Sequence, residues 1–501
     1  MAIKQRQKVV FLIPNTTWFG KRYWHNFPYT EALLKSVLVE SGFAVDVIDA
    51  NIDDLTEFQL EAKIRESDAD VIGIGEMALE YKDCVHRSFE IIKKANPKIV
   101  TIVGGIYPSL SPEIVTKDKN IDYFVFGEGE KRLPALLNAL GGEGSLEEID
   151  GLAYREGSEL LIRPPKITDV VDLDLLPMPD YSGFDMPKYA NYQQKFTQNF
   201  RFKQLPVAIT MTSRGCPFRC TFCSSKELYG QKVRTRSPAA VLREVDMLVE
   251  KFGIKELVFV DDSLLWPRNR AIEIMNGLIE RREAGCDLVW KSNNLGIHNM
   301  DDEILDKMKA SGCYQIIVSI ESGAPSTLKR MRKPVNLEQA EKTLELIHTK
   351  GFDDVSSNFV IGMPGDTWDD IRETFSFVER MSDRGLLDYA VFHIATPFPK
   401  TELYETCKMN RYIPDDFSFE DPKYYGFGKG VITTPEFVPG ELQVLRAYEW
   451  DRINFKTTAK REKIARMLGI TLDELENWRK DTRRSVGLNV KAVDDRSQFQ
   501  K

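Results

Sequence analysis

The chain has 501 residues, of which 42% are hydrophobic and 29% are charged, and its formal net charge is −8. This length exceeds the size at which a single hydrophobic core stops growing, so the chain is expected to hold about two to four domains. The acidic balance disfavours a broad nucleic-acid surface, and the lack of a long apolar run disfavours a membrane span.

The first segment, MAIKQRQKVVFLIPN, places basic residues before a short apolar run that ends at Pro14. The run lacks a small-residue cleavage site, so it predicts a first strand rather than a signal peptide. Four of the seven cysteines are scattered singly along the chain: Cys84, Cys286, Cys313 and Cys407. We therefore expect a reducing, cytoplasmic location rather than a disulfide framework.

Between residues 8 and about 140, short Val- and Ile-rich runs alternate with amphipathic segments. The runs predict five strands: KVVFLIPN, FAVDVIDAN, ADVIGIGEM, KIVTIVGG and IDYFVFGEGE. Between the first two lies YTEALLKSVLVESG, whose apolar residues follow helical spacing and whose glycine marks a helix end. This alternation predicts an open, doubly wound parallel sheet of the α/β class. Ligands of such sheets bind beyond the carboxyl ends of the strands, here the loops after Pro14, Gly75, Gly104 and Gly127.

A proline-rich stretch, RPPKITDVVDLDLLPMPDY, predicts a connector without long regular structure. A second alternation of strands and helices starts at QLPVAITMTSRG and ends at LDYAVFHIATPFP. One of its helices is indicated by Ser237 as the N-cap residue and Pro238 as the first helical residue. Six strand and helix units are too few for a closed eight-stranded barrel, so a partial barrel is expected.

The remaining residues are mostly helical in pattern and polar. REKIARMLGITLDELENWRK has the spacing of a helix-turn-helix, but Asp473, Glu474 and Glu476 lie where a nucleic-acid-reading helix would be basic. A helical cap over the barrel is the favoured interpretation. The expected division is residues 1–145 for the first sheet, 146–204 for the connector, 205–425 for the partial barrel and 426–501 for the helical extension.

The segment SRGCPFRCTFCSS gathers Cys216, Cys220 and Cys223 in the loop after the first barrel strand. Three thiols at this spacing could bind a structural zinc ion, form a redox pair or hold an iron–sulfur cluster. Structural zinc takes four protein ligands, and all five histidines are remote in sequence. A cubane cluster normally takes four cysteines, so three would leave one iron open to a small molecule. We favour the cluster.

The CxxxCxxC motif, with an aromatic residue before its third cysteine, resembles the signature of the radical S-adenosylmethionine (SAM) superfamily. The resemblance implies that Cys216, Cys220 and Cys223 ligate a [4Fe-4S] cluster whose open iron binds SAM. It also implies that one electron from the cluster cleaves SAM to a 5′-deoxyadenosyl radical, and that an external donor such as flavodoxin or ferredoxin supplies the electron.

Three further segments resemble the parts of that barrel that contact SAM. IIVSIESG implies contacts by Glu321 and Ser322, although a strand-end acid could instead cap the following turn. FVIGMPGDT implies contacts by Gly362 and Pro364, although it could be an ordinary strand-to-helix turn. VDDSLLW implies a contact by Asp261, which could equally belong to the acidic start of a helix.

IVGGIYPSLSPE and DYFVFGEGE resemble the cobalamin-binding domain that is fused to one group of radical SAM barrels. That group includes the anaerobic magnesium-protoporphyrin ester cyclase and many C-methyltransferases. The two resembling domains cover about residues 8 to 425, and the resemblance implies five cobalamin contacts: Gly104, Gly105, Gly127, Glu128 and Gly129. An open sheet with glycine turns also describes flavodoxin-like domains without cobalamin.

Two positions depart from the patterns of these families. Free-standing cobalamin domains supply an axial histidine in a DxHxxG motif, but His25 in PNTTWFGKRYWHNFP has neither the Asp nor the Gly, so no lower cobalt ligand is assigned. The same loop is rich in aromatic residues (Trp18, Tyr23 and Trp24), which are expected to pack against the corrin, the barrel or the other domain. In ATPFPKT, Lys400 stands where the superfamily usually has glycine, which puts a close backbone approach there in doubt.

The resemblance implies two kinds of reaction. In the favoured one, the radical takes hydrogen from an unactivated carbon of a small molecule (a natural product or a lipid- or tetrapyrrole-like compound), and methylcobalamin supplies a methyl group. In the alternative, the substrate radical is cyclised, oxidised or rearranged without methyl transfer. Both need a closed, dry cavity. A methylthiotransferase is disfavoured, because those enzymes carry a second cluster on three N-terminal cysteines and only Cys84 precedes Cys216.

Overall fold

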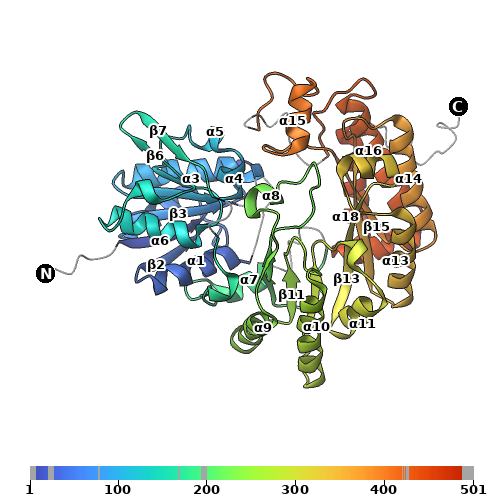
Figure 1. The fold of residues 1–501 in the computed structure, drawn as a ribbon, viewed down its shortest axis with the longest axis horizontal. Coiled ribbons are helices and arrows are strands. Elements are labelled where there is room, and N and C mark those ends of the chain that lie inside the picture. Colours follow the sequence, from blue (N-terminus) through green and yellow to red (C-terminus); the bar gives the residue numbers. More distant parts are fainter. Residues whose placement is uncertain are drawn as a thin grey trace.

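A computed structural model of the chain describes residues 7–20, 27–76, 79–166, 170–192, 200–419, 421, 424 and 428–487. Two α/β units follow one another in it, and a helical segment lies at the carboxyl end (Figure 1). This arrangement confirms the predicted fold class. None of the helices within these ranges is long and apolar enough to cross a membrane.

The first unit is built on a seven-stranded sheet with the order β2-β1-β3-β4-β5-β6-β7. Its strands are β1 (Lys8–Ile13), β2 (Ala44–Asp49), β3 (Val71–Glu76), β4 (Val100–Gly105), β5 (Tyr123–Val125), β6 (Leu152–Glu156) and β7 (Glu159–Arg163). The first five are parallel to one another, as the sequence predicted. Their carboxyl ends therefore meet at one edge of the sheet.

The last two strands correct the prediction for the connector. β6 and β7 form an antiparallel hairpin, and β6 also pairs antiparallel with β5, so the sheet extends to Arg163 instead of ending near residue 140. The turn is made by Gly157 and Ser158, and Gly157 has a φ of +61°. A Gly-Ser pair between two five-residue runs is a hairpin signal that the sequence analysis missed. The irregular connector starts only after this hairpin.

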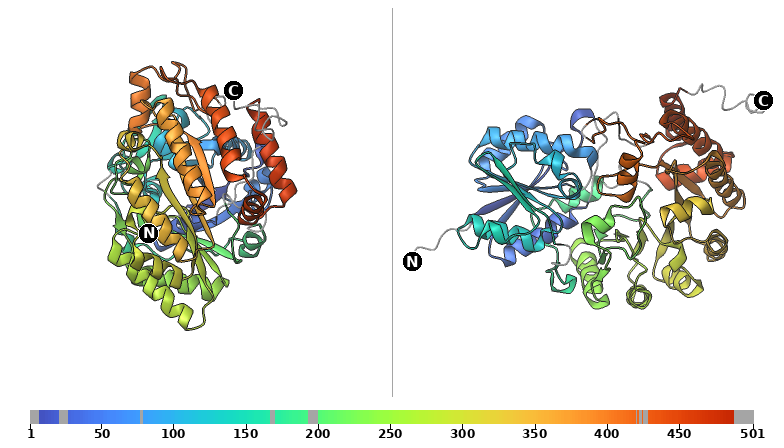
Figure 2. Two further views of the ribbon diagram at one scale, coloured as in Figure 1. Left: turned by 90° about the vertical axis from the view of Figure 1, so that its right-hand side faces the viewer. Right: turned by 45° about the horizontal axis from the view of Figure 1, so that its top comes forward.

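Helices cover both faces of this sheet because both faces of a parallel sheet are apolar (Figure 2). They are α1 (Tyr29–Glu40), α2 (Glu57–Glu66), α3 (Lys82–Ala95), α4 (Ile106–Leu110), α5 (Pro112–Val115) and α6 (Gly129–Leu140). α1 and α6 pack together over one face, and α2 and α3 pack over the other. The connector contains one further helix, α7 (Met186–Tyr192).

The second unit is an open parallel sheet of six strands with the order β15-β14-β13-β12-β11-β8, which confirms the predicted partial barrel. These strands are β8 (Val207–Thr210), β11 (Glu256–Phe259), β12 (Val289–Ser292), β13 (Cys313–Glu321), β14 (Asp354–Ile361) and β15 (Tyr389–Ile394). A two-stranded antiparallel ribbon, β9 (Ser213–Arg214) with β10 (Arg234–Thr235), follows β8. Because the strands are parallel and consecutive, all the loops at their carboxyl ends lie on one side of the barrel.

The helices of this unit alternate with its strands. They are α8 (Ser225–Tyr229), α9 (Pro238–Phe252), α10 (Arg268–Glu283), α11 (Asp302–Ala310), α12 (Pro325–Met331), α13 (Leu337–Thr349), α14 (Trp368–Asp383) and α15 (Glu402–Met409). α9 starts as predicted, because the Ser237 side chain accepts a hydrogen bond from the Ala240 backbone N–H (3.3 Å) and Pro238 is the first helical residue.

Replacing Ser237 with alanine should lower the free energy of unfolding by about 1 kcal/mol, because one backbone donor at the start of α9 loses its acceptor. Urea denaturation followed by circular dichroism measures this change. Ser237→Asp keeps a capping oxygen and should unfold close to the unmodified protein. Equal midpoints for the alanine and aspartate variants would show that this cap contributes nothing.

Three helices form the carboxyl-terminal segment: α16 (Pro439–Asn454), α17 (Thr458–Leu468) and α18 (Leu472–Ser485). The Asn454 amide bonds both the N–H (2.8 Å) and the C=O (2.9 Å) of Ala390, so α16 covers the open edge of β15. Asp451 on α16 pairs with Arg479 (2.6 Å) and Arg483 (2.9 Å) on α18, and all three side chains are buried. The segment thus packs on the barrel edge, in line with the predicted cap.

Candidate radical SAM and cobalamin sites

The three-cysteine loop starts directly after strand β9 of the β9–β10 ribbon. Gly215 precedes Cys216 and has a φ of +88°, and a Cβ atom at this position would lie 2.7 Å from the Lys232 carbonyl oxygen. Only glycine fits such an approach without moving the backbone. The ribbon therefore fixes the direction in which the cysteine loop leaves the barrel.

Asp261, at the end of β11, holds the chain just before this loop. Its carboxylate accepts hydrogen bonds from the Thr212 N–H (3.0 Å), the Thr212 hydroxyl (2.7 Å) and the Ser213 hydroxyl (2.5 Å). The side chain is buried, and burial raises the pKa of Asp261 although these bonds lower it. In this structure Asp261 positions the start of the cysteine loop, and its direct contact with SAM stays a prediction.

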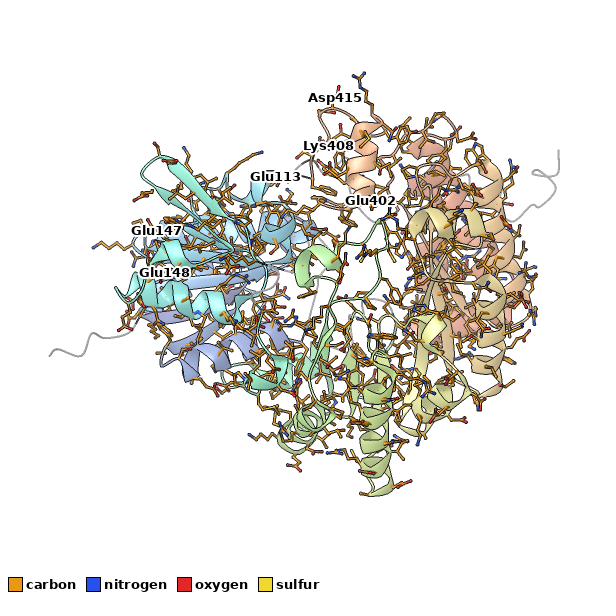
Figure 3. All side chains as sticks on the ribbon, viewed as in Figure 1. Glu113, Glu147, Glu148, Glu402, Lys408 and Asp415 are labelled. Atoms are coloured by element: carbon orange, nitrogen blue, oxygen red, sulfur yellow. The ribbon has the colours of Figure 1, made fainter. Side chains whose placement is uncertain are left out.

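The middle of the loop is held by two later helices. The Thr221 N–H donates to the Met331 carbonyl (3.0 Å), and the Leu403 N–H donates to the Thr221 carbonyl (2.9 Å). Beside these bonds, Arg332 at the end of α12 forms a two-point ion pair (2.7 and 2.8 Å) with Glu402 at the start of α15. Figure 3 labels Glu402. The loop is therefore held by bonds to the end of α12 and the start of α15.

All three thiols of the loop are free and partly exposed. The Ser263 hydroxyl lies 3.4 Å from the Cys216 sulfur, and the Ser225 N–H donates to the Cys223 sulfur (3.5 Å). The thiols are close enough to influence one another, since Cys216 and Cys223 both raise the pKa of Cys220. Burial is the larger cause, and it raises that pKa to about 11.

These thiols fit a cluster better than one metal ion. Desolvation raises the pKa of Cys220 and of Cys223, and bound cations would offset this cost and favour their thiolates. Among the residues that the structure describes, no three His, Cys, Asp or Glu side chains are arranged to hold a single metal ion. A cubane cluster gives each thiolate its own iron, so its ligands need not meet at one point. The arrangement thus favours an iron–sulfur cluster over zinc.

Glu321 lies at the end of β13, where its backbone takes a φ of +73°, which is unusual for a residue other than glycine. Its carboxylate pairs with the Lys333 ammonium at 3.0 Å, and both side chains are about 10% exposed (10% and 12%). Burial alone would lower the pKa of Lys333, but the charges of Glu321 and Cys220 raise it. A carboxylate and an ammonium group therefore lie together beside the cysteine loop. Lys333 carries no local motif, and the sequence analysis missed it.

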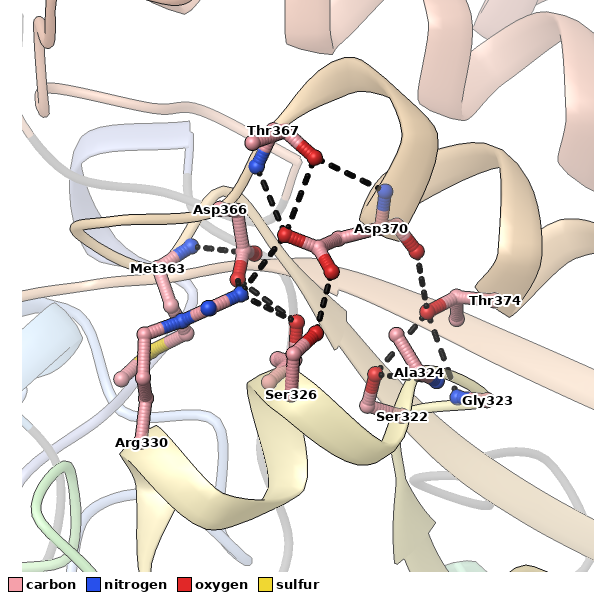
Figure 4. Close-up of polar contacts among 11 residues, drawn as sticks. Ser322, Gly323, Ala324, Ser326, Arg330, Met363, Asp366, Thr367, Asp370 and Thr374 are labelled. Atoms are coloured by element: carbon pink, nitrogen blue, oxygen red, sulfur yellow. Dashed lines mark hydrogen bonds and ion pairs between the residues drawn. The ribbon is translucent and has the colours of Figure 1, made fainter.

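Ser322, one of the predicted SAM contacts, belongs to a polar network at the ends of β13 and β14 (Figure 4). The buried Ser322 hydroxyl lies 2.9 Å from the Thr374 hydroxyl and accepts a bond from the Ala324 N–H (3.1 Å). Gly362 has a φ of +80°, and a Cβ atom there would lie 2.4 Å from Leu442 of α16. The Ser322 hydroxyl thus bonds to the protein, and Leu442 leaves no room for a side chain at Gly362; contacts of both residues with SAM stay predictions.

The turn after Gly362 is held through Asp366. Its carboxylate accepts bonds from the Met363 N–H (2.9 Å), the Thr327 hydroxyl (2.7 Å) and the Arg330 guanidinium (2.8 Å). Pro364 lies inside this turn and is half-buried, and its contact with SAM also stays a prediction. The network ties the loop after β14 to helix α12, which precedes Lys333.

His298 is a second residue that the sequence analysis missed. Its ring lies 4.7 Å from the ring of Phe218, inside the cysteine loop, at an angle of 88°. Both ring nitrogens are buried without a hydrogen-bond partner in the structure. Burial lowers the pKa of His298, and the charge of Lys333 lowers it further. Since buried polar atoms rarely stay unpaired, this imidazole is suited to a ligand bound beside the loop.

The predicted cobalamin residues lie at the carboxyl ends of β4 and β5. Gly75 and Gly104 are register partners on β3 and β4, so two neighbouring positions of the sheet edge have no side chain. A Cβ atom at Gly104 would make only ordinary contacts, the nearest at 3.7 Å, and Gly105 has a φ of +104°. Bare backbone at a sheet edge lets a large ligand approach closely, so these residues fit a cobalamin cofactor.

Glu128 does not have a free carboxylate. It pairs with Arg214 (3.4 Å) and with Arg234, whose second nitrogen lies 3.1 Å from the other carboxylate oxygen. Its neighbour Gly127 has a φ of +72°, and Gly129 starts α6. The cobalamin contacts of these three residues stay predictions, and the structure places the Glu128 side chain against the second unit.

The predicted aromatic loop after β1 lies only partly within the described residues. Tyr23, Trp24 and His25 lie outside the described residues, whereas the Trp18 indole donates to the Leu55 carbonyl (3.2 Å) inside the first unit.

A cavity of about 320 Å³ lies between the connector and the start of β8, next to Pro206 and Val207. It is at the amino-terminal side of the barrel, opposite the cysteine loop, so it is not the site described above.

Two family patterns match this chain. The B12 binding domain matches residues 24–137, and the radical SAM superfamily matches residues 210–378. The first range covers β2 to β5 of the first sheet, and the second covers the cysteine loop and β11 to β14 of the partial barrel. The two predicted domain types are thereby confirmed.

Similar proteins match most of the chain. An uncharacterized methyltransferase of Pyrococcus horikoshii is 30% identical over 81% of this chain and 84% of its own length. Cytidylyl-2-hydroxyethylphosphonate methyltransferase of Streptomyces wedmorensis is 28% identical over 87% and 88%, and the anaerobic magnesium-protoporphyrin IX monomethyl ester cyclase of Rubrivivax gelatinosus is 27% identical over 87% and 75%.

Among solved structures, the cobalamin-dependent SAM radical enzyme OxsB, with aqua-cobalamin and SAM bound, has the same fold. The two superpose with a TM-score of 0.72 at 18% identity, over 96% of this chain and 72% of that chain. The sheet with a bare glycine edge, the partial barrel with its three-cysteine loop and these matches agree with one another. The chain therefore belongs to the radical SAM enzymes that carry a B12-binding domain before the barrel.

Proposed function

We propose that this protein methylates an unactivated carbon of a small molecule, with a [4Fe-4S] cluster, SAM and cobalamin as cofactors. The observation that carries the proposal is a contact between the two cofactor regions. Arg214 lies two residues before Cys216 and pairs with Glu130, which directly follows Gly129. The cysteine loop and the segment predicted to contact cobalamin are therefore neighbours, as the transfer of a methyl group from SAM to cobalamin requires. Relatives that are named methyltransferases support the same reading.

Each group of residues has a role in this proposal. Cys216, Cys220 and Cys223 hold the cluster and leave one iron for SAM. Glu321 and Lys333 offer a negative and a positive charge to the amino and carboxylate groups of SAM, so they orient it beside the loop. When bound, the cluster supplies the electron that cleaves SAM, and cobalamin carries the methyl group.

A second reaction is the alternative. The cyclase of Rubrivivax gelatinosus matches 87% of this chain, so the same two domains also occur in a protein named for ring formation. In that case the substrate would be cyclised, oxidised or rearranged without gaining a methyl group. The substrate itself differs between these relatives, so neither name is carried over to this chain.

Anaerobic reconstitution separates the two reactions. The protein is loaded with iron, sulfide and hydroxocobalamin, and should then contain about four iron atoms and about one cobalt atom per chain. Incubation with SAM and dithionite should yield both 5′-deoxyadenosine and S-adenosylhomocysteine. Deoxyadenosine without S-adenosylhomocysteine would support the alternative, and failure to retain cobalt would leave the first sheet with a structural role.

We further propose that a small acidic electron carrier such as flavodoxin or ferredoxin reduces the cluster, in the cytoplasm. The support is the fragile nature of an iron–sulfur cluster with an open iron, which suits a reducing compartment. Replacing dithionite with reduced flavodoxin should sustain deoxyadenosine formation. No product with any protein donor would refute this part of the proposal.

A further inference from the structure

Four charged side chains form a buried cluster between the two units, which we call the interdomain ion cluster: Glu128, Glu130, Arg214 and Arg234. Their side chains are only 5 to 11% exposed. The two acids come from the end of the first sheet and the first turn of α6, and the two arginines come from the β9–β10 ribbon. Two positive charges therefore face two negative charges across the boundary.

The arginines are placed by the ribbon itself. Arg214 and Arg234 are register partners in the antiparallel β9–β10 pair, so their backbones are neighbours. Arg214 bonds Glu130 and also lies 3.4 Å from Glu128, and Arg234 bonds Glu128 and the Val171 carbonyl (3.3 Å). Glu128 is thus shared by both arginines. A buried set of this kind loses stability sharply when one member is removed, because a partner charge stays buried and uncompensated.

A second contact joins the first unit to the segment after β15, the edge strand opposite β8 in the barrel sheet. Lys400, in the loop after β15, donates from its ammonium group to the Ser109 carbonyl in α4. The Ser109 hydroxyl donates to the Gly105 carbonyl (2.6 Å) and accepts from the Gly127 N–H (2.8 Å). Ser109 therefore joins the loops after β4 and β5, and Lys400 joins both to the barrel.

Lys400 adopts a φ of +64°, the left-handed conformation that glycine takes easily. A lysine at such a position costs backbone strain that glycine avoids, and here its side chain makes a contact that glycine lacks. An apolar contact adds to it, because Phe419, from the segment after α15, is buried in the core of the first unit. Segments that follow both edge strands of the barrel, β8 and β15, thus contact the first unit next to the loops after β4 and β5.

We infer that Glu130, Arg214 and Lys400 are positioning residues that set the placement of the cysteine loop relative to the glycine edge of the B12-binding domain. They touch neither substrate nor cofactor in this assignment and act through the two loops that they join. The inference rests on the proposed function for its consequence, since only the transfer of a methyl group from SAM to cobalamin depends on that placement. Cleavage of SAM at the cluster alone does not.

Glu130→Gln tests the inference, since it keeps the shape of the side chain but leaves Arg214 without its closest negative partner. The reconstituted protein, loaded with hydroxocobalamin, receives SAM and dithionite. S-adenosylhomocysteine should fall about 100-fold relative to deoxyadenosine, because a misplacement of about 1 Å costs that much in a transfer step. Iron and cobalt contents should stay unchanged. Glu130→Asp keeps the charge and should recover part of the transfer.

Two further variants complete the test. Glu148→Gln changes an exposed acid on the outer side of the first unit, away from the barrel, and should behave like the unmodified protein (Figure 3). Lys400→Gly removes the bond to Ser109 and should lower transfer in the same direction as Glu130→Gln. Its matched control is Lys408→Met, on α15 beside the Tyr404 ring.

A measurement that does not depend on enzymatic activity tests whether Glu130 holds the loops after β4 and β5 in place. Hydrogen–deuterium exchange of peptides covering residues 104–110 and 127–132 should rise in Glu130→Gln and stay unchanged in Glu148→Gln. Unchanged exchange and an unchanged product ratio would overturn the inference, and loss of cobalt would overturn it in favour of direct cofactor binding. If the unmodified protein forms no S-adenosylhomocysteine, the proposed function fails, and the exchange data alone then decide whether Glu130 fixes these loops.

Discussion

Replacing Cys220 with alanine should abolish both cluster binding and the cleavage of SAM. The loop offers three thiols, one for each of three irons, so the loss of one leaves two irons without a cysteine ligand. Deoxyadenosine should fall to the background of the cluster-free protein. Iron and sulfide analysis and the loss of the sulfide-to-iron absorbance measure the same event independently of activity.

The matched control is Cys286→Ala. Cys286 is a free, partly exposed cysteine outside the loop, in the turn after α10, and its removal should change neither the iron content nor the deoxyadenosine yield. Circular dichroism of both variants shows whether the fold is intact. A Cys220→Ala protein that is folded and still cleaves SAM would refute the cluster assignment and every step that depends on it.

Most of the fold is predictable because its signals are local. Parallel strands are buried on both faces, so they appear as short Val- and Ile-rich runs, and several helices between them, such as α9 at Ser237, start at a capping side chain. The hairpin β6–β7 was missed although its Gly157–Ser158 turn was visible. Its position just before a proline-rich stretch led to an interpretation as connector, and pairing with β5 is a long-range property.

The candidate site likewise contains residues that a local motif predicts and residues that only folding brings together. The three cysteines form one short motif, so their proximity follows from the sequence alone. Lys333 and His298 come from separate loops, after α12 and after β12, and only folding brings them to the cysteine loop. The role of Asp261 was also hidden, because its partners Thr212 and Ser213 are about 50 residues away and lie on the neighbouring strand's extension.

The same limitation applies between the two units. The sequence suggests Glu128 as a cofactor contact because it lies between two glycines at a strand end. It carries no sign of the arginines that it meets, which lie about 100 residues later. Charged residues at a domain boundary are thus easily mistaken for ligand contacts. Burial and pairing, which only the structure provides, separate the two roles.

Replacing Lys333 with methionine should weaken SAM binding by about 10- to 100-fold while leaving the cluster in place. Methionine keeps most of the side-chain volume but removes the charge, so Glu321 stays buried without its partner at 3.0 Å and SAM loses a cationic group. Bonds to charged groups contribute about 1.5–3 kcal/mol, which corresponds to this range in the dissociation constant. Equilibrium dialysis of labelled SAM against the cluster-loaded protein measures it.

The controls separate binding of SAM from support of the cluster. Lys329→Met removes an exposed lysine from α12, four residues earlier, and should bind SAM like the unmodified protein. Lys333→Arg keeps the charge and should recover most of the affinity, whereas a merely space-filling role would be met equally well by methionine. Unchanged affinity in Lys333→Met would show that the Lys333–Glu321 pair only stabilises the end of β13, and loss of iron would assign it to cluster assembly.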